Sequence, residues 1–203
     1  SYSVRYGVTY AQVPTGGYVK SVGKKVVEVD WSEGGNPSTT QYYIGISSVG
    51  VEVSTLSYKN WDTYSAINKS FDEFDGLEVN TKYYIWVKAR NSKGVETVAH
   101  TIPSTWTLCE VPGSPTVNAI SSSEIRIDTT SINSNPDATT RYAIKVVLHD
   151  GTTRYIQIDD TLGASATYYY LSEWGEIKAG GLDVNATYYF SISAMNGSGV
   201  CSD

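Results

Sequence analysis

Histidines, paired carboxylates and tryptophans are the residues of this 203-residue chain whose types could support chemistry. The two histidines, His100 and His149, stand far apart and outside any metal-ligand spacing, so the sequence predicts no metal site. Asp159-Asp160, or Asp72-Glu73 with Asp75, could serve glycoside cleavage or calcium binding, although loop acids of an acidic protein are usually solvated. No nucleophile elbow, phosphate loop or dinucleotide fingerprint occurs. We therefore predict no catalytic residue, no enzymatic activity and no cofactor.

Tryptophan side chains offer flat faces on which a sugar ring can stack. Trp86 is the best exposed candidate, because strand alternation points it away from the predicted core residues Ile85 and Val87. Contacts between subunits explain surface Trp and Tyr at least as well as a sugar site does. The candidates for such a platform are Trp61, Trp86, Trp106 and Trp174.

Composition narrows the class of protein. A net charge of −6 and the lack of any Lys/Arg cluster argue against nucleic acid as a partner. No apolar run approaches 18 residues, so no transmembrane segment is predicted. N-glycosylation sequons begin at Asn68, Asn185 and Asn196, and together with 17 Tyr they favour a secreted glycoprotein with glycans attached at Asn.

A repeat of about 100 residues organises the chain. The segment 26–31 matches 124–129 at an offset of 98, and Asn36-Pro37 matches Asn135-Pro136. The strand-like segment 42–46 matches 142–146, and 77–91 matches 182–196 at an offset of 105. Because the order is kept throughout, the repeat predicts two tandem domains.

Apolar residues alternate with polar ones within each copy. Alternation of period two is typical of antiparallel sheets with one buried face, and no segment has apolar residues at helical spacing over three turns. Asp150-Gly151 between two apolar runs predicts a tight hairpin, since this pair tolerates positive φ. Short strands divided by Gly, Pro and Asn predict an all-β sandwich in each copy.

The segment from Leu77 to Asn91 resembles the penultimate strand of fibronectin type III domains. Trp31 stands where that family keeps its core Trp, and Tyr83 and Tyr188 match its tyrosine corner. The second copy has Thr129 in place of the Trp, so we expect another aromatic residue, Trp174, to fill that core. The resemblance covers nearly the whole chain and implies two immunoglobulin-like (fibronectin type III-like) sandwiches that act as a scaffold or binding module.

The two copies differ in their last strand. Residues 97–108 supply it in the first copy, whereas only residues 200–203 follow the corresponding turn in the second. The segment 1–14 aligns with 101–112, which suggests a spare last strand at the start of the chain. We therefore predict a donor strand at 1–13, a first domain at 14–110 and a second domain at 111–203 that lacks its last strand.

Strand donation between identical subunits follows from this arrangement. The predicted donor side chains alternate along the first segment and the predicted acceptor edge lies on the penultimate strand of the second copy. The donor residues are Tyr2, Val4, Tyr6, Val8 and Tyr10, and the acceptor residues are Tyr188, Phe190, Ile192 and Ala194. A donor and an acceptor at opposite ends make a contact that propagates into an open homopolymer.

Other readings remain open from the sequence. The segment 1–13 could be the first strand of the first domain, although 17–23 already matches 115–121 in that role. The chain could be a piece of a longer tandem-repeat surface protein, could complete its own sandwich, or could be a monomeric adhesion or carbohydrate-binding module. The arrangement, with its sequons, few charges and abundant Tyr, Thr and Ser, resembles the thread-type surface filaments of thermoacidophilic archaea. That resemblance implies an extracellular cell-surface filament built by donor-strand complementation.

The resemblance to fibronectin type III domains also bears on the two cysteines. In that family the last turn lies at the pole where the chain enters the domain, which brings Cys109 and Cys201 near each other. We predict a disulfide between them in an oxidising location. The alternative is two unrelated small residues, and the equivalent positions of the first copy are Ala11 and Glu96.

Overall fold

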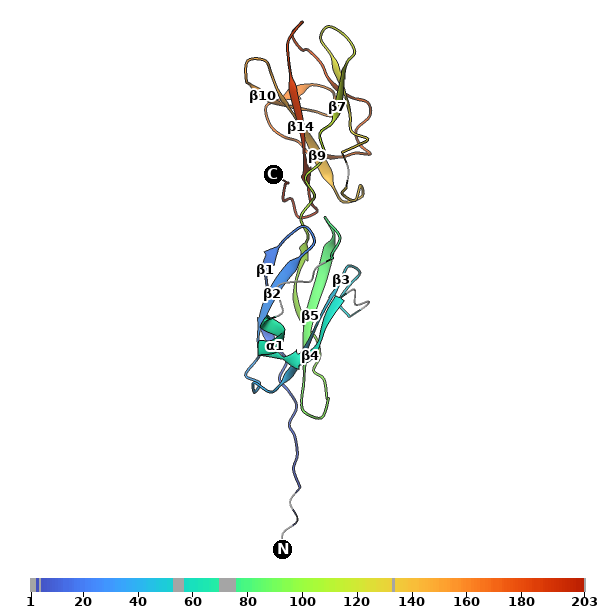
Figure 1. The fold of residues 1–203 in the computed structure, drawn as a ribbon. Helices are drawn as coiled ribbons and strands as arrows, with labels where there is room; N and C mark the ends of the chain where they lie inside the picture. Colours follow the sequence, from blue (N-terminus) through green and yellow to red (C-terminus); the bar gives the residue numbers. More distant parts are fainter. Residues whose placement is uncertain (1–2, 4, 53–56, 70–75, 133, 203) are drawn as a thin grey trace. The chain divides into compact units, whose positions relative to one another are not determined.

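The computed structural model describes residues 3, 5–52, 57–69, 76–132 and 134–202, and their side chains except at 57–60, 68 and 69. The described chain is strand and loop apart from one short helix, so the all-β prediction is confirmed (Figure 1). The elements of the first half are β1 (Thr15–Val22), β2 (Val27–Ser32), β3 (Gln41–Ser47), β4 (Ser57–Thr63), α1 (Tyr64–Lys69), β5 (Lys82–Arg90) and β6 (His100–Trp106). Those of the second half are β7 (Thr116–Ala119), β8 (Ile125–Asp128), β9 (Arg141–Val147), β10 (Thr153–Ile156), β11 (Leu162–Gly163), β12 (Tyr169–Tyr170), β13 (Ile177–Ala179) and β14 (Tyr189–Met195).

The chain forms two compact units. The first unit comprises Ser1–Glu78 and Lys82–Thr107, and the second comprises Val79–Thr81 and Leu108–Asp203. In the first unit β1 pairs with β2, and the other sheet has the order β4-β3-β5-β6. In the second unit one sheet has the order β13-β8-β7, and in the other sheet β9 pairs with β10 and β12 on one edge and with β14 on the other edge. All of these pairs are antiparallel.

The core of the first unit follows the predicted alternation of period two. Trp31 is buried in it, as the family resemblance implied, and its ring meets that of Tyr64 edge to face with the centroids 5.3 Å apart. Such an edge-to-face arrangement is favourable because ring edges and faces carry opposite partial charges. The strands contribute Val27, Val29 and Trp31 from β2, Tyr42, Ile44 and Ile46 from β3, and Tyr83, Ile85, Val87 and Ala89 from β5.

The second unit has its own core, which includes the repeat equivalents Ile127, Tyr142 and Ile192. Trp174 is part of it and packs edge to face on Tyr169 with the centroids 5.2 Å apart. The prediction that Trp174 replaces the missing Trp of the second strand is therefore confirmed. The predicted hairpin at Asp150-Gly151 is also confirmed, since Gly151 has φ +83° and joins β9 to β10.

Candidate functional site

The tyrosine corner is present in both units. The backbone N–H of Glu78 donates to the Tyr83 hydroxyl at 2.9 Å, and the N–H of Asp183 donates to the Tyr188 hydroxyl at 2.7 Å. Each bond ties the chain before a long strand to the start of that strand, since Tyr83 lies in β5 and Tyr188 directly precedes β14. The prediction taken from the family resemblance is confirmed at both positions.

The turn after the long strand is also repeated in detail. The side-chain Oδ1 of Asn91 accepts from the N–H groups of Lys93 and Val95, and that of Asn196 accepts from those of Ser198 and Val200. Beyond each turn, the next residues also bond back to the long strand. The N–H of Thr97 donates to the Ala89 carbonyl at 2.8 Å, and that of Ser202 donates to the Ala194 carbonyl at 2.7 Å. After both turns the chain therefore runs in the same direction, antiparallel to the long strand that precedes the turn.

The two long strands then differ in their pairing. In the first unit β5 lies between two partners, with seven residue pairs to β3 and with β6 on its other edge from Lys82 to Val87. In the second unit β14 makes seven residue pairs with β9. On the opposite edge of β14, the part of the chain that the structure describes supplies only the bridge Met195–Cys201 and the bonds from Ser202.

A groove lies beside this open edge and extends across β14 to β9 and β10. It has a volume of about 370 Å³, and its lining includes the segment Val111–Ser114, the β14 residues Ser191, Ile192 and Ser193, and Lys145, Tyr155, Ala166 and Tyr168. The Tyr168 hydroxyl lies 3.1 Å from the Ser193 hydroxyl. Exposed backbone N–H and C=O groups on such an edge are a template for another strand.

The predicted acceptor residues lie on or beside this strand. Ala194 and Ile192 are buried in the second core, and Phe190 and Tyr188 are partly buried and packed against it. Tyr189, on the other face of β14, is 69% exposed. The side chains predicted as the acceptor thus already belong to the core, and what β14 leaves open is its backbone edge and the adjacent groove.

The described residues of the predicted donor segment belong to the first unit and have no regular secondary structure. Tyr6 is 79% exposed and Tyr10 is 80% exposed, and Val8 is exposed as well. The Lys93 ammonium lies 4.8 Å from the centre of the Tyr6 ring, and Asn91 donates to the Thr9 carbonyl at 3.0 Å. Two further donor residues, Tyr2 and Val4, lie outside the described residues.

The same clamp holds the chain where it enters each unit. Asn36 exchanges two hydrogen bonds with the backbone of Gln12, its Oδ1 accepting and its Nδ2 donating, both at 2.8 Å. Asn135 does the same with the backbone of Glu110, at 2.7 and 3.0 Å. Since 12 and 110 differ by 98, the segment before the first unit and the segment before the second are structural equivalents, as the sequence repeat predicts.

The two cysteines are free thiols in the structure, so the predicted disulfide is not formed in it. Cys109 is buried in the second core and Cys201 is exposed at the start of the open edge. Burial raises the pKa of Cys109 to about 11, and the nearby Cys201 thiol contributes to the rise. The disulfide remains a prediction for oxidising conditions, and Ala11 packs on the first core at the position equivalent to Cys109.

The three sequons differ in what surrounds them. Asn185 is exposed, in a loop with φ +56°. Asn196 is fully buried, and its Oδ1 holds the turn before Cys201, so a glycan there requires the turn to open. Asn68 lies in α1, and its side chain is outside the described ones.

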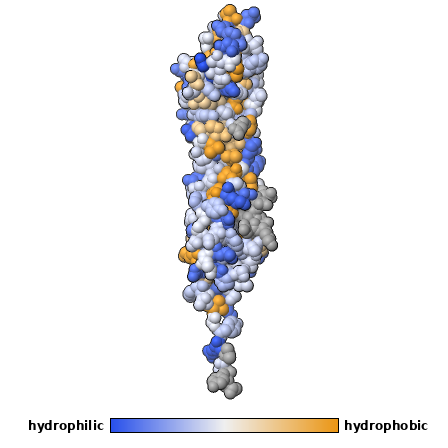
Figure 2. Space-filling view, turned by 90° about the vertical axis from the view of Figure 1, so that its left-hand side faces the viewer, coloured by the Kyte–Doolittle hydropathy of each residue, from blue (hydrophilic) through white to orange (hydrophobic). Residues whose placement is uncertain are grey.

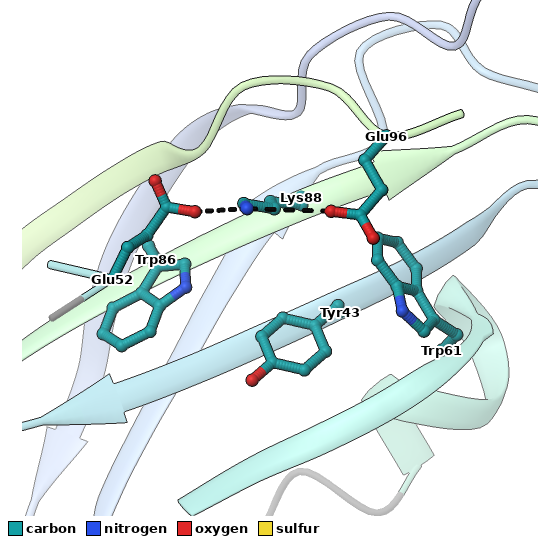
Figure 3. A pocket seen from close by; sticks show the side chains of 6 residues that line it. All are labelled: Tyr43, Glu52, Trp61, Trp86, Lys88 and Glu96. Carbon is teal, nitrogen blue, oxygen red and sulfur yellow. Dashed lines mark ion pairs between the residues drawn. The ribbon is translucent and has the colours of Figure 1, made fainter. Parts of the chain in front are cut away.

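A hollow on the outer face of the first unit gathers aromatic and charged side chains. It measures about 210 Å³ and is lined by Tyr43, Glu52, Trp61, Trp86, Lys88 and Glu96 (Figure 3). The Lys88 ammonium pairs with Glu52 and, at 3.7 Å, with Glu96. The hydrogen bond that Lys88 donates to the Glu52 carboxylate raises the pKa of Lys88 above its ordinary value. The rings of Tyr43 and Trp61 lie 5.6 Å apart.

The prediction that Trp86 is exposed is wrong. Trp86 does lie outside the core cluster, on the face that alternation predicts, but only 1% of it is exposed. The reason is Gly45, its partner on β3: a Cβ at that position would lie 2.5 Å from the Trp86 ring, so the absence of a side chain lets the ring lie on the strand. Among the other candidates, Trp61 is partly buried and covered by the Arg90 guanidinium at 4.5 Å, and Trp174 belongs to the second core.

Within the described residues no group of three His, Cys, Asp or Glu side chains is placed to hold a metal ion. His149 pairs with Asp183 at 3.4 Å, and its ring meets that of Tyr188. No helix among the described residues is long and apolar enough to cross a membrane. Hydrophobic residues nevertheless reach the surface in several places on the face that Figure 2 shows.

Comparison with solved structures supports the fold. The two fibronectin type III domain segment of chicken tenascin matches with a TM-score of 0.51 and 15% identity over 95% of both chains. The FN1–FN3 domains of chicken CNTN1 match with a TM-score of 0.32 and 20% identity over 92% of this chain and 62% of that one, which adds nothing to the assignment. No protein-family model and no curated protein matches the sequence. The chain thus consists of two fibronectin type III-like β-sandwiches in tandem.

Proposed function

We propose that this chain is the structural subunit of an extracellular filament whose subunits join head to tail by strand donation. The observation that carries the proposal is the difference between the two long strands. A second partner strand closes β5, whereas the edge of β14 beside the groove is open in the described chain. A tandem sandwich of this kind also fits an extracellular structural or adhesive module without catalytic activity.

The segment 1–13 is the occupant that we propose for the open edge. By the offset of 98 it corresponds to β6 and the residues after it, and the clamp at Gln12 and Glu110 supports that equivalence. Burying an exposed apolar side chain such as Tyr6, Val8 or Tyr10 contributes about 1.5–3 kcal/mol, and each ladder hydrogen bond adds about 0.5–1.5 kcal/mol. Strand addition therefore offers both affinity and register.

Assembly of this kind continues indefinitely. The donor lies in the first unit and the acceptor in the second, so each copy donates to one neighbour and accepts from another. The partners are identical subunits, and the sequon at Asn68 suits a secreted glycoprotein whose Asn185 is left unmodified. Among known assemblies this arrangement resembles the thread-type filaments of archaeal cell surfaces.

Electron microscopy of the whole chain beside a variant lacking 1–13 tests the proposal. Filaments are expected from the whole chain alone, while circular dichroism should show the same β content in both. A synthetic peptide with the sequence 1–13 should bind the shortened variant at one copy per chain and stop assembly of the whole chain. A matched peptide with Val4→Asp and Val8→Asp should do neither.

Two results would overturn strand donation. Filaments from the shortened variant would show that another surface joins the subunits. Single molecules from the whole chain, without peptide binding by the shortened variant, would favour a domain pair whose open edge is closed by a strand from a longer chain.

The hollow beside Tyr43 supports a second candidate function, the binding of a neutral sugar ring. Its partly exposed Tyr43 and Trp61 rings offer stacking faces, and its carboxylates, already paired with Lys88, still accept hydrogen bonds from hydroxyls. Its 210 Å³ is smaller than the roughly 300–1,000 Å³ of sites for drug-sized ligands, so it suits a single ring. Titration of methyl glycosides by NMR, with Trp61→Ala as the variant that should lose binding, tests this function, and unchanged Tyr43 and Trp61 signals would reject it.

A further inference from the structure

The loop before β14 has a close counterpart before β5, and the two differ in burial. Val79 and Asn80 are 5% and 0% exposed, whereas their repeat equivalents at an offset of 105, Val184 and Asn185, are exposed, Val184 by 68%. Both asparagines have the left-handed backbone, with φ +42° at Asn80 and +56° at Asn185. The loops thus have the same shape, but only the first is covered.

Within the second unit, four groups surround Asn80. Its Nδ2 donates to the Thr140 hydroxyl at 2.7 Å, and the N–H of Gly197 donates to its Oδ1 at 2.9 Å. The Thr139 hydroxyl donates to its carbonyl at 3.1 Å, and its own N–H donates to the carbonyl of Leu108 at 3.2 Å. All of its hydrogen-bonding groups are thereby used.

The first unit presents the repeat equivalents of all four groups. Thr39 and Thr40 correspond to Thr139 and Thr140 at an offset of 100, since each Thr pair directly precedes a strand, β3 or β9. Ser92 corresponds to Gly197 at an offset of 105, and Tyr10 to Leu108 at an offset of 98. Thr39, Thr40, Ser92 and Tyr10 line one cavity of about 160 Å³, together with the clamp residue Asn36 and its neighbours.

We propose that Asn185 of one copy binds in this cavity of the next copy. Its Nδ2 then donates to the Thr40 hydroxyl, its Oδ1 accepts from the Ser92 N–H, and Val184 is covered beside it. The inference rests on the proposed function and involves the same two copies. The copy that donates 1–13 to β14 also brings its Tyr10 and Thr40 to Asn185. A glycan on Asn185 would fill the cavity, so the contact requires Asn185 to be unmodified.

The critical concentration for assembly of unglycosylated protein measures this contact. Asn185→Gly keeps the left-handed backbone and removes the side chain, and Thr40→Val removes the acceptor hydroxyl at nearly constant volume. The loss of two intermolecular hydrogen bonds by Asn185→Gly is expected to raise the critical concentration about tenfold. The double variant should be little worse than Asn185→Gly alone, because Thr40 then has no side chain to bind. Thr187→Ala, which removes the sequon and keeps Asn185, should assemble like the parent.

The outcomes separate this contact from strand donation itself. Filaments of Asn185→Gly with an unchanged critical concentration would overturn the proposed contact and leave strand donation in place. Additive effects in the double variant would also overturn it, because they would show that Asn185 and Thr40 do not meet. If the parent forms no filaments, the proposed function fails and this inference fails with it.

Discussion

The strands β5 and β14 begin after the same tyrosine corner and end in the same asparagine-held turn, yet their outer edges differ. β6 closes β5, with Ile102 fully buried opposite Ile85, while beside β14 there is a groove of about 370 Å³. Local sequence therefore determines the strand, its corner and its turn in both units. What lies on the outer edge depends on a segment elsewhere, and in the second unit we propose that another copy supplies it.

Closing the open edge within one chain is the change with the largest expected effect. Adding the sequence of 1–13 after residue 203 through a short flexible linker should fill the groove in the same molecule. Filaments should then be lost, and the second unit should melt at a higher temperature, because the added strand closes its sheet. Electron microscopy and calorimetry measure the two effects.

The control for this extension carries Val4→Asp and Val8→Asp in the added copy, and it should still form filaments. If the extended chain assembles as well as the parent does, the edge of β14 is not where subunits join.

A substitution in β6, the strand that closes the edge of β5, tests how much the closed edge stabilises the first unit. Ile102→Ala removes a fully buried side chain from β6 and should cost the first unit about 2–5 kcal/mol of unfolding free energy. Urea denaturation followed by tryptophan fluorescence measures the loss, because four of the five tryptophans lie in the first unit. Thr101→Ala, at an exposed neighbouring position, should change it by no more than about 0.5 kcal/mol, and equal losses would mean that β6 is not an essential part of this core.

The two clamps at the chain's entrance to each unit should differ in strength. Asn135 is buried, so Asn135→Ala leaves the backbone groups of Glu110 unpaired and should cost about 1–3 kcal/mol. Asn36 makes the same bonds in a more exposed place, and Asn36→Ala should cost about 0.5–1.5 kcal/mol. Urea denaturation of both variants checks the order, and a larger loss at Asn36 would contradict it.

The smallest effect is a pH dependence of the stability of the second unit. Burial raises the pKa of Cys109 to about 11, so the thiol ionises first in the unfolded chain, and stability should fall as pH rises from about 9 toward 11. Between pH 8 and 10 the loss should be about 1 kcal/mol under reducing conditions. Cys109→Ala, which places there the residue of the first unit's equivalent position, should remove that loss. A Cys109→Ala variant with the same slope would assign the loss to another group.

The sequence predicts much of the fold because the repeat and the alternation act over short distances. Leu77 to Asn91 and its copy identify the long strands, both tyrosine corners and both turns, and the placement of Trp31 and Trp174 in the two cores follows from the same alignment. The asparagine clamps were missed, although Asn36-Pro37 and Asn135-Pro136 are part of the repeat. The repeated Asn-Pro pair was visible in the sequence, but the sequence does not show which backbone groups the Asn side chain binds.

The exposure of Trp86 was mispredicted for a different physical reason. Alternation determines on which face a side chain lies, and here it indicated that face correctly. Whether the face is covered depends on the neighbouring strand, where Gly45 leaves room for the ring. The hollow with Glu52 and Lys88 was likewise unpredictable, because its residues come from three strands and two loops that meet only in the folded sheet.

The pairing of β14 with β9 has a mechanical consequence. Its seven residue pairs lie side by side along the strand, with hydrogen bonds perpendicular to it. A pull along the strand axis therefore shears all of these bonds at once, whereas a pull across the sheet would break them one after another. A donated strand on the open edge would carry tension in the same shearing geometry, so such a joint is expected to resist stretching far better than peeling.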